Sequence, residues 1–231
     1  MVKRILTVIF LLVLSGSGFA KDITIAVLDF DNNSIFQKDE FNPLKKGLAE
    51  IINTRLGGVS GIKLVERRRL SSIFDEIKLS QSGMVSEDAT IKIGKLAGAK
   101  YLVFGSFIVV PKNKIRIDVR IVNVETGITA KAEEITGKNS KILYLSDKLC
   151  RKIVKNLSKS FDNIEFTESG SYVQNVNFKA MLSFSKGVEF QEKGDLLNAI
   201  TEFERALEYE HDFKLAKQRL EFLQKTNKIS R

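Results

Sequence analysis

The stretch from Ile23 to Phe30 constrains the fold of this 231-residue chain most, because nearly every residue in it is apolar. A strand of this composition is covered on both faces, as in a sheet with helices on each side. Turn formers at residues 31–34 then end the strand. We therefore expect a layered α/β core built around this strand.

In the segments that follow, apolar residues recur with the spacing of helices in some and with the spacing of strands in others. Apolar residues recur at helical spacing within residues 44–56, 70–77, 89–97 and 142–157. Strands are predicted for residues 62–65, 101–110, 115–121 and 128–133, and the last three are joined by short connections. This order predicts an α/β domain over residues 21–160, with a mixed sheet layered with helices.

The pattern changes after residue 160. Residues 161–177 lack a sustained period and carry Ser, Gly and Asn, so they are predicted to form a linker. From residue 178 to 226 the pattern is helical throughout, which predicts an all-α second domain: a helical hairpin and a capping helix that carries Leu215, Leu220 and Leu223.

Residues 1–20 have the pattern of a signal peptide. Lys3 and Arg4 form a basic start, an apolar run follows, and Gly18-Phe19-Ala20 matches a small-x-small cleavage site. No Cys lies near this site to accept a lipid, so we expect an exported periplasmic protein, peripheral to the outer membrane, that is not a lipoprotein. The alternative is an uncleaved anchoring helix.

Composition excludes several classes of site. The chain has one Cys and one His, which rules out a Cys/His zinc site, an intramolecular disulfide and a c-type haem motif. We predict no cofactor, and we expect Cys150 to be a buried, unreactive thiol. The net charge of +9, of which Lys3 and Arg4 contribute two, favours anionic partners. Export disfavours nucleic acid as that partner.

One acidic pair could support catalysis. Asp29 and Asp31 follow the first strand, where α/β enzymes place catalytic groups. A magnesium site for phosphoryl transfer also needs a Lys and further acidic residues at other strand ends, and no such acidic pair follows the later strands. The favoured interpretation is a turn at the strand exit, and the alternative is an exported enzyme that uses Asp29 and Asp31.

Two basic clusters could contact anions. One is Arg67, Arg68 and Arg69, and the other, on the predicted helix at residues 141–160, is Lys148, Arg151, Lys152 and Lys155. A solvated surface explains both. The alternative is docking on an anionic lipid or a cell-wall polymer.

Four segments together resemble the CsgG family, named for the curli production assembly/transport component and related to the amino-terminal domain of TolB. They are residues 25–34 (IAVLDFDNNS), 64–67 (LVER) with Leu70, 93–106 (IGKLAGAKYLVFGS) and 122–127 (VNVETG). The resemblance covers about residues 23–160. It implies an α/β domain that acts in envelope or surface-structure assembly by binding other proteins, without catalysis.

One feature of the family is missing. The curli secretion channel is a lipoprotein whose subunits contribute two long hairpins to a membrane barrel, and each spanning strand needs about ten residues. Here only the turn from Pro111 to Lys114 joins two strands. A pore is therefore not expected.

The carboxy-terminal pattern resembles a tetratricopeptide (TPR) repeat. Its small and large packing positions would be Gly187, Phe190, Gly194, Ala199, Phe203 and Ala206. Ser183 stands where Trp is usual and His211 where Pro is usual, and a generic helical hairpin is the alternative. The resemblance implies protein binding through these helices. Our leading hypothesis is a non-enzymatic envelope protein that scaffolds partner proteins, with homo-oligomers as a further form.

Overall fold

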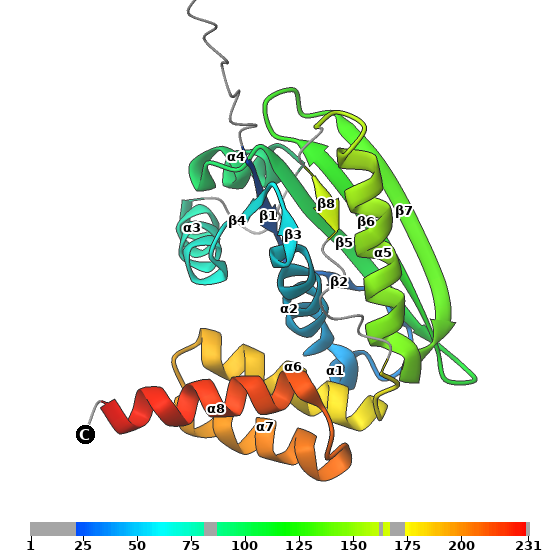
Figure 1. Cartoon of the computed structure of the whole chain (residues 1–231), viewed down its shortest axis with the longest axis vertical. Helices are drawn as coiled ribbons and strands as arrows, with labels where there is room; N and C mark the ends of the chain where they lie inside the picture. The colour runs from blue at the N-terminus through cyan, green and yellow to red at the C-terminus, as the bar shows by residue number, and fades with distance from the viewer. Residues whose placement is uncertain (1–21, 81–86, 162–163, 167–173, 230–231) are drawn as a thin grey trace, which may run out of the picture.

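The computed structural model describes residues 22–80, 87–161, 164–166 and 174–229. These residues form a sheet layered with helices, followed by three helices at the carboxy-terminal end (Figure 1). The predicted fold class, α/β and then all-α, is confirmed. The predicted leader lies outside the described residues.

The main sheet has six strands, in the order β4-β1-β5-β6-β7 with β2 beside β5. The strands are β1 (Ile23–Val27), β2 (Asp31–Asn32), β4 (Ile62–Leu64), β5 (Tyr101–Val110), β6 (Lys114–Asn123) and β7 (Thr129–Lys138). β1 is parallel to both β4 and β5, whereas β5, β6 and β7 form the predicted antiparallel meander. The sheet is therefore mixed.

Helices cover the two faces of this sheet unequally. α2 (Leu44–Gly57) and α5 (Ile142–Leu157) pack on one face, and α3 (Arg67–Ser80) and α4 (Glu87–Ala97) pack beside β1 on the other (Figure 1). The alternation in β6 reflects this arrangement, since Ile117 and Val119 are buried while Arg116 and Arg120 are exposed. The uncovered face of β6 and β7 is consequently charged.

Several short elements lacked a periodic signal in the sequence. They are α1 (Lys38–Phe41), β3 (Val59–Ser60), the 3₁₀ turn η1 (Asn139–Lys141) and β8 (Glu165–Phe166). β8 lies in the segment predicted to be a linker and pairs antiparallel with β3. Ile164 and Val176 of the same segment are buried in the main core. The described part of this segment therefore packs against the α/β domain.

The carboxy-terminal helices are α6 (Phe178–Glu192), α7 (Leu196–Tyr209) and α8 (Lys214–Ile229). Asn177 caps α6, accepting a hydrogen bond at its side chain from the Lys179 N–H, and the Asp195 side chain caps α7. Their apolar side chains join one continuous core with α2, α5 and the covered face of the sheet. The helices and the sheet domain thus share one hydrophobic core.

Candidate protein-interaction site

The TPR-like helices pack on the α/β domain through α6, which lies directly on helix α2. At the crossing of α2 and α6, a Cβ added to Gly47 would lie 1.9 Å from Ser185 Oγ and 2.7 Å from Ser185 Cβ. Small residues on both helices therefore set how closely they approach. A single helix pair buries too little surface to be stable alone, and α2 supplies the neighbouring helix that a second repeat would supply in an array.

The predicted packing positions form the inside of the hairpin. Ala199, Phe203 and Ala206 are fully buried, and a Cβ on Gly187 would lie 2.5 Å from the Phe203 ring. The Phe203 ring also lies 5.7 Å from that of Phe184, between ring centroids. These positions hold α6 against α7, so any partner would contact other side chains of the same helices.

The turn between the two helices depends on Gly194, whose φ of 79° lies in the left-handed region that favours glycine. The next residue, Asp195, accepts a hydrogen bond from the Asn198 N–H at 3.2 Å and so begins α7. Phe190, in the last turn of α6, is half-buried against the core. The carboxy-terminal region is consistent with a TPR-like hairpin capped by α8.

A cluster of six charged side chains lies at the junction between the sheet domain and these helices. It contains three carboxylates and three cations: Asp29, Glu50, Glu192, Lys46, Arg67 and Arg219. Arg67 bridges Asp29 at 2.5 Å and Glu192 at 2.7 Å, and Arg219 of α8 pairs with Glu50 of α2. We call this set the junction cluster; its contacts fix the orientation of α6 and α8 on α2 and α3.

The electrostatics of Asp29 follow from this cluster. Burial acts to raise its pKa, but the adjacent Arg67 and Lys46 charges outweigh that effect and hold the pKa of Asp29 below its ordinary value. The carboxylate is thus ionised and paired at neutral pH. Its contacts join the end of β1 to helices α2 and α3.

Asp31 lies apart from this cluster. It begins β2, where it pairs in register with Ser106 of β5, and its side chain is exposed. Within the part of the chain that the structure describes, no group of three His, Cys, Asp or Glu side chains could hold a metal ion. The arrangement places Asp29 in a salt-bridge network and leaves Asp31 on the surface.

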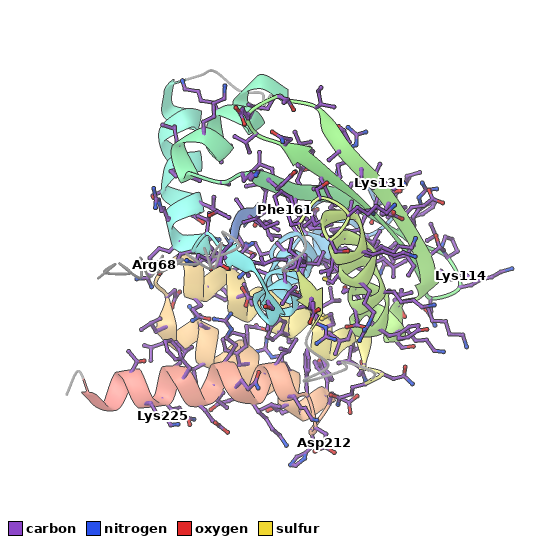
Figure 2. The ribbon with its side chains drawn as sticks, turned by 45° about the horizontal axis from the view of Figure 1, so that its top comes forward. Arg68, Lys114, Lys131, Phe161, Asp212 and Lys225 are labelled. Atoms are coloured by element: carbon purple, nitrogen blue, oxygen red, sulfur yellow. The ribbon has the colours of Figure 1, made fainter. Side chains whose placement is uncertain are left out.

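The first predicted basic cluster is divided by the structure. Arg67 is about one-tenth exposed and contacts protein carboxylates. Arg68 and Arg69 are exposed at the start of α3, and Figure 2 shows the position of Arg68. An external anion could therefore reach only the last two.

The second basic cluster forms the outer face of α5. Lys148, Arg151, Lys152 and Lys155 are all exposed. Two of them already have acidic partners, since Arg151 pairs with Asp147 at 2.9 Å and Lys152 with Glu133 at 3.0 Å. Lys148 and Lys155 leave this helix a net basic surface.

Cys150 lies on the opposite side of α5 and is completely buried, as predicted. Burial raises the pKa of its thiol well above the ordinary value, and the neighbouring Asp147 acts in the same direction. The group is therefore protonated and shielded from reagents.

The residues that join the two parts of the chain were not predicted from the sequence. Gly47 lies in the first turn of a predicted helix, and a glycine inside a helical pattern is a signal of close packing because its helix propensity is low. Three of the charged residues interrupt or border apolar stripes, and no local motif marks them as ion-pair partners: Glu50, Glu192 and Arg219. No short-range signal pairs these charges, because they meet only after the helices pack.

The fold and the junction define a class: an α/β domain extended by TPR-like helices that pack on one of its own helices. A family described as curli production assembly/transport component CsgG has a model that matches residues 10–113. The predicted resemblance of the amino-terminal domain to the CsgG family is therefore confirmed. No curated protein matches the sequence at a significant level.

Several solved structures are similar to this chain. For the LpoB carboxy-terminal domain from Salmonella enterica, the TM-score is 0.36 at 18% identity, over 53% of this chain and 87% of that domain. For TolB from Acinetobacter baumannii, the TM-score is 0.42 at 16% identity, and the match covers 60% of this chain and 29% of TolB. For the PelC dodecamer from Paraburkholderia phytofirmans, the TM-score is 0.34 at 16% identity, and the match covers 62% of this chain and 92% of the PelC chain.

Proposed function

We propose that this protein is a non-enzymatic component of the cell envelope that binds and scaffolds partner proteins through its carboxy-terminal helices. The observation that carries the proposal is the distribution of exposed apolar side chains. Of the eight large ones that the described residues expose, four lie on α7 and α8: Leu196, Leu197, Tyr209 and Phe222. Leu196 and Leu197 adjoin at the start of α7, and neighbouring exposed apolar side chains of this size are typical of a contact surface.

The packing of the helices leaves this surface available. One side of the hairpin is covered by α2, and Leu215, Ala216 and Leu223 of α8 pack into the shared core. Leu197 and Phe222 remain 75% and 59% exposed, although both belong to well-formed helices. α7 and α8 run antiparallel, so the start of α7 lies beside the second half of α8 (Figure 1). A rigid scaffold thus presents apolar side chains to solvent, which favours binding of a partner with little loss of conformational entropy.

The described residues include no helix long and apolar enough to cross a bilayer. Two further features support the proposed function. The pairing of Asp29 with Arg67 and Lys46 gives that carboxylate a structural role and makes catalysis by Asp29 and Asp31 the weaker alternative. The family description and the predicted leader both favour the envelope. We therefore propose an exported protein that assembles with envelope proteins or with copies of itself, without a pore and without nucleic acid.

Site-specific crosslinking in the native envelope tests the proposal. A photoreactive residue is placed at Leu197 or Phe222, and a matched control at Lys155, which is exposed in the last turn of α5. Figure 1 shows this end of α5 on the side of the molecule away from α7 and α8. We expect both helix positions to capture the same partner proteins, identified by mass spectrometry, and the control to capture none of them. If the control gives the same products, or if neither helix position gives any, the carboxy-terminal surface is not the binding site.

The absence of catalysis is tested separately with purified protein and generic phosphate esters in the presence of magnesium. We expect no turnover. Turnover that Asp29→Asn abolishes would show that the strand end is an active site.

A further inference from the structure

Two loops meet at the end of the sheet where β5 turns into β6. The loop after β2 contributes Phe36, and the β5–β6 turn contributes Pro111 and Lys112; together with Ser140 they line one groove of about 700 Å³. Figure 1 shows this turn beside α1 and the start of α5. We call the loop residues 35–36, the turn residues 111–114 and the adjoining residues 138–141 the sheet tip.

The sheet tip exposes two consecutive large apolar side chains. Ile35 is 84% exposed and Phe36 is 65% exposed. The neighbouring Pro111 is exposed as well. These side chains project from a loop rather than filling a recess in the protein, so they are suited to entering another apolar phase.

Four lysines lie at the same end of the sheet as these apolar side chains. Lys112 and Lys114 lie in or beside the turn, Lys138 is the cross-strand neighbour of Lys114, and Lys141 follows on η1. Figure 2 shows Lys114 projecting outward from this end. Like charges directly opposite one another destabilise a sheet, and no carboxylate of the described residues forms an ion pair with any of these four lysines. An external anionic surface would relieve this repulsion.

The tip is held in a defined conformation. Gln37, Lys112 and Asn113 are the non-glycine residues of the described chain with positive φ, at 50°, 63° and 54°. Two successive residues in this region form the tight hairpin turn, and the Asn139 N–H donates to the Asn113 carbonyl at 2.8 Å. The turn is thus fastened to the end of β7, which holds its lysines at this end of the sheet.

We infer that the sheet tip docks on the surface of an anionic lipid bilayer, with Ile35 and Phe36 entering the headgroup region and the lysines contacting lipid phosphates. Exposed apolar side chains next to basic residues bind such surfaces by combining burial with charge attraction. Asp39 and Glu40 of α1 are the acidic groups nearby, and Glu40 accepts a hydrogen bond from Gln37. Four unpaired lysines outweigh these two carboxylates.

Vesicle flotation tests this inference on the full chain, purified after export. The probes are vesicles of phosphatidylcholine alone and vesicles with one quarter phosphatidylglycerol. We expect binding to the anionic vesicles only, and weaker binding as salt rises. Phe36→Ala, and separately the pair Lys112→Gln with Lys114→Gln, should each weaken binding about fivefold or more.

Two control variants separate the tip from general charge and general hydrophobicity. Phe222→Ala removes an aromatic ring of similar exposure on α8, and Lys148→Gln with Lys155→Gln removes two exposed lysines from α5. Both should bind vesicles within about twofold of the wild type. Equal losses in the controls, or equal binding to both kinds of vesicle, would overturn the inference. Binding of soluble polyglutamate without any vesicle binding would do so too, and would identify an acidic polypeptide as the ligand.

This inference does not depend on the proposed partner surface. The Phe36→Ala protein should keep the crosslinks formed from Leu197 on α7. Loss of those crosslinks in a variant that still binds vesicles would count against the partner surface alone.

Discussion

Replacing Gly47 with Ala tests whether small residues set the distance between the sheet domain and the TPR-like helices. Two effects oppose each other. Ala in a helix interior is favoured over Gly by about 0.5–1 kcal/mol. The new methyl group, however, would lie 1.9 Å from Ser185 Oγ and 2.7 Å from Ser185 Cβ, closer than atoms can approach, so α2 and α6 must separate. Overpacking of this kind costs about 1–3 kcal/mol.

We therefore expect a net loss of about 1–2 kcal/mol in the free energy of unfolding, because the steric cost exceeds the gain in helix propensity. In a chain of this size, that loss corresponds to a decrease of roughly 2–8 °C in Tm. The measurement is thermal unfolding followed by circular dichroism, with limited proteolysis to show whether residues 178–226 are released first.

A matched control and a second-site variant make the test specific. Gly58→Ala places a methyl group on an exposed glycine at the end of the same helix, where the nearest atom is the Arg55 carbonyl oxygen at 3.7 Å. It should change stability by no more than about 0.5 kcal/mol. Ser185→Gly removes the atoms that collide, so it should recover part of the loss in a double-mutant cycle. A Gly47→Ala protein as stable as the wild type, or the absence of coupling with Ser185→Gly, would refute close packing at this crossing.

Three further predictions concern the core and the charged groups. Phe203→Ala should lower the free energy of unfolding by about 3–5 kcal/mol, because a fully buried ring is lost between α6 and α7. Protease sensitivity should then appear first in the carboxy-terminal helices. Asp147→Ala should lower the free energy of unfolding, measured in urea, by about 3–5 kcal/mol, since it leaves the buried Arg55 guanidinium without this carboxylate. The control Asp31→Ala, at an exposed position, should change this free energy little. Because the folded pKa of Asp29 is lowered, its stabilising effect is complete above its ordinary value of 3.8 and is lost as the pH falls through the folded value. The stability difference between wild type and Asp29→Asn should thus be largest above about pH 4 and should shrink toward zero in acid, and a pH-independent difference would contradict the Arg67 pairing.

Much of the fold could be predicted from local patterns. The apolar composition around β1, the alternation in β6 and the helical stripe of α5 each depend on residues that are near one another in the sequence. The same is true of the left-handed glycine at Gly194, which marks the turn between α6 and α7. Periodicity is a local property, because the backbone geometry of a strand or helix alone decides which side chains share a face.

The tertiary structure alone decided how the two parts are joined. Asp29 meets Arg67 across 38 positions of sequence, and Arg219 meets Glu50 across 169. Strands β3 and β8, of two residues each, pair across more than a hundred residues and carry no period of their own. Such contacts exist only once α6 has packed on α2, where the absence of a side chain at Gly47 lets the helices approach. The sequence around a charged residue does not reveal its ion-pair partner, because electrostatic pairing depends on distance in the folded molecule.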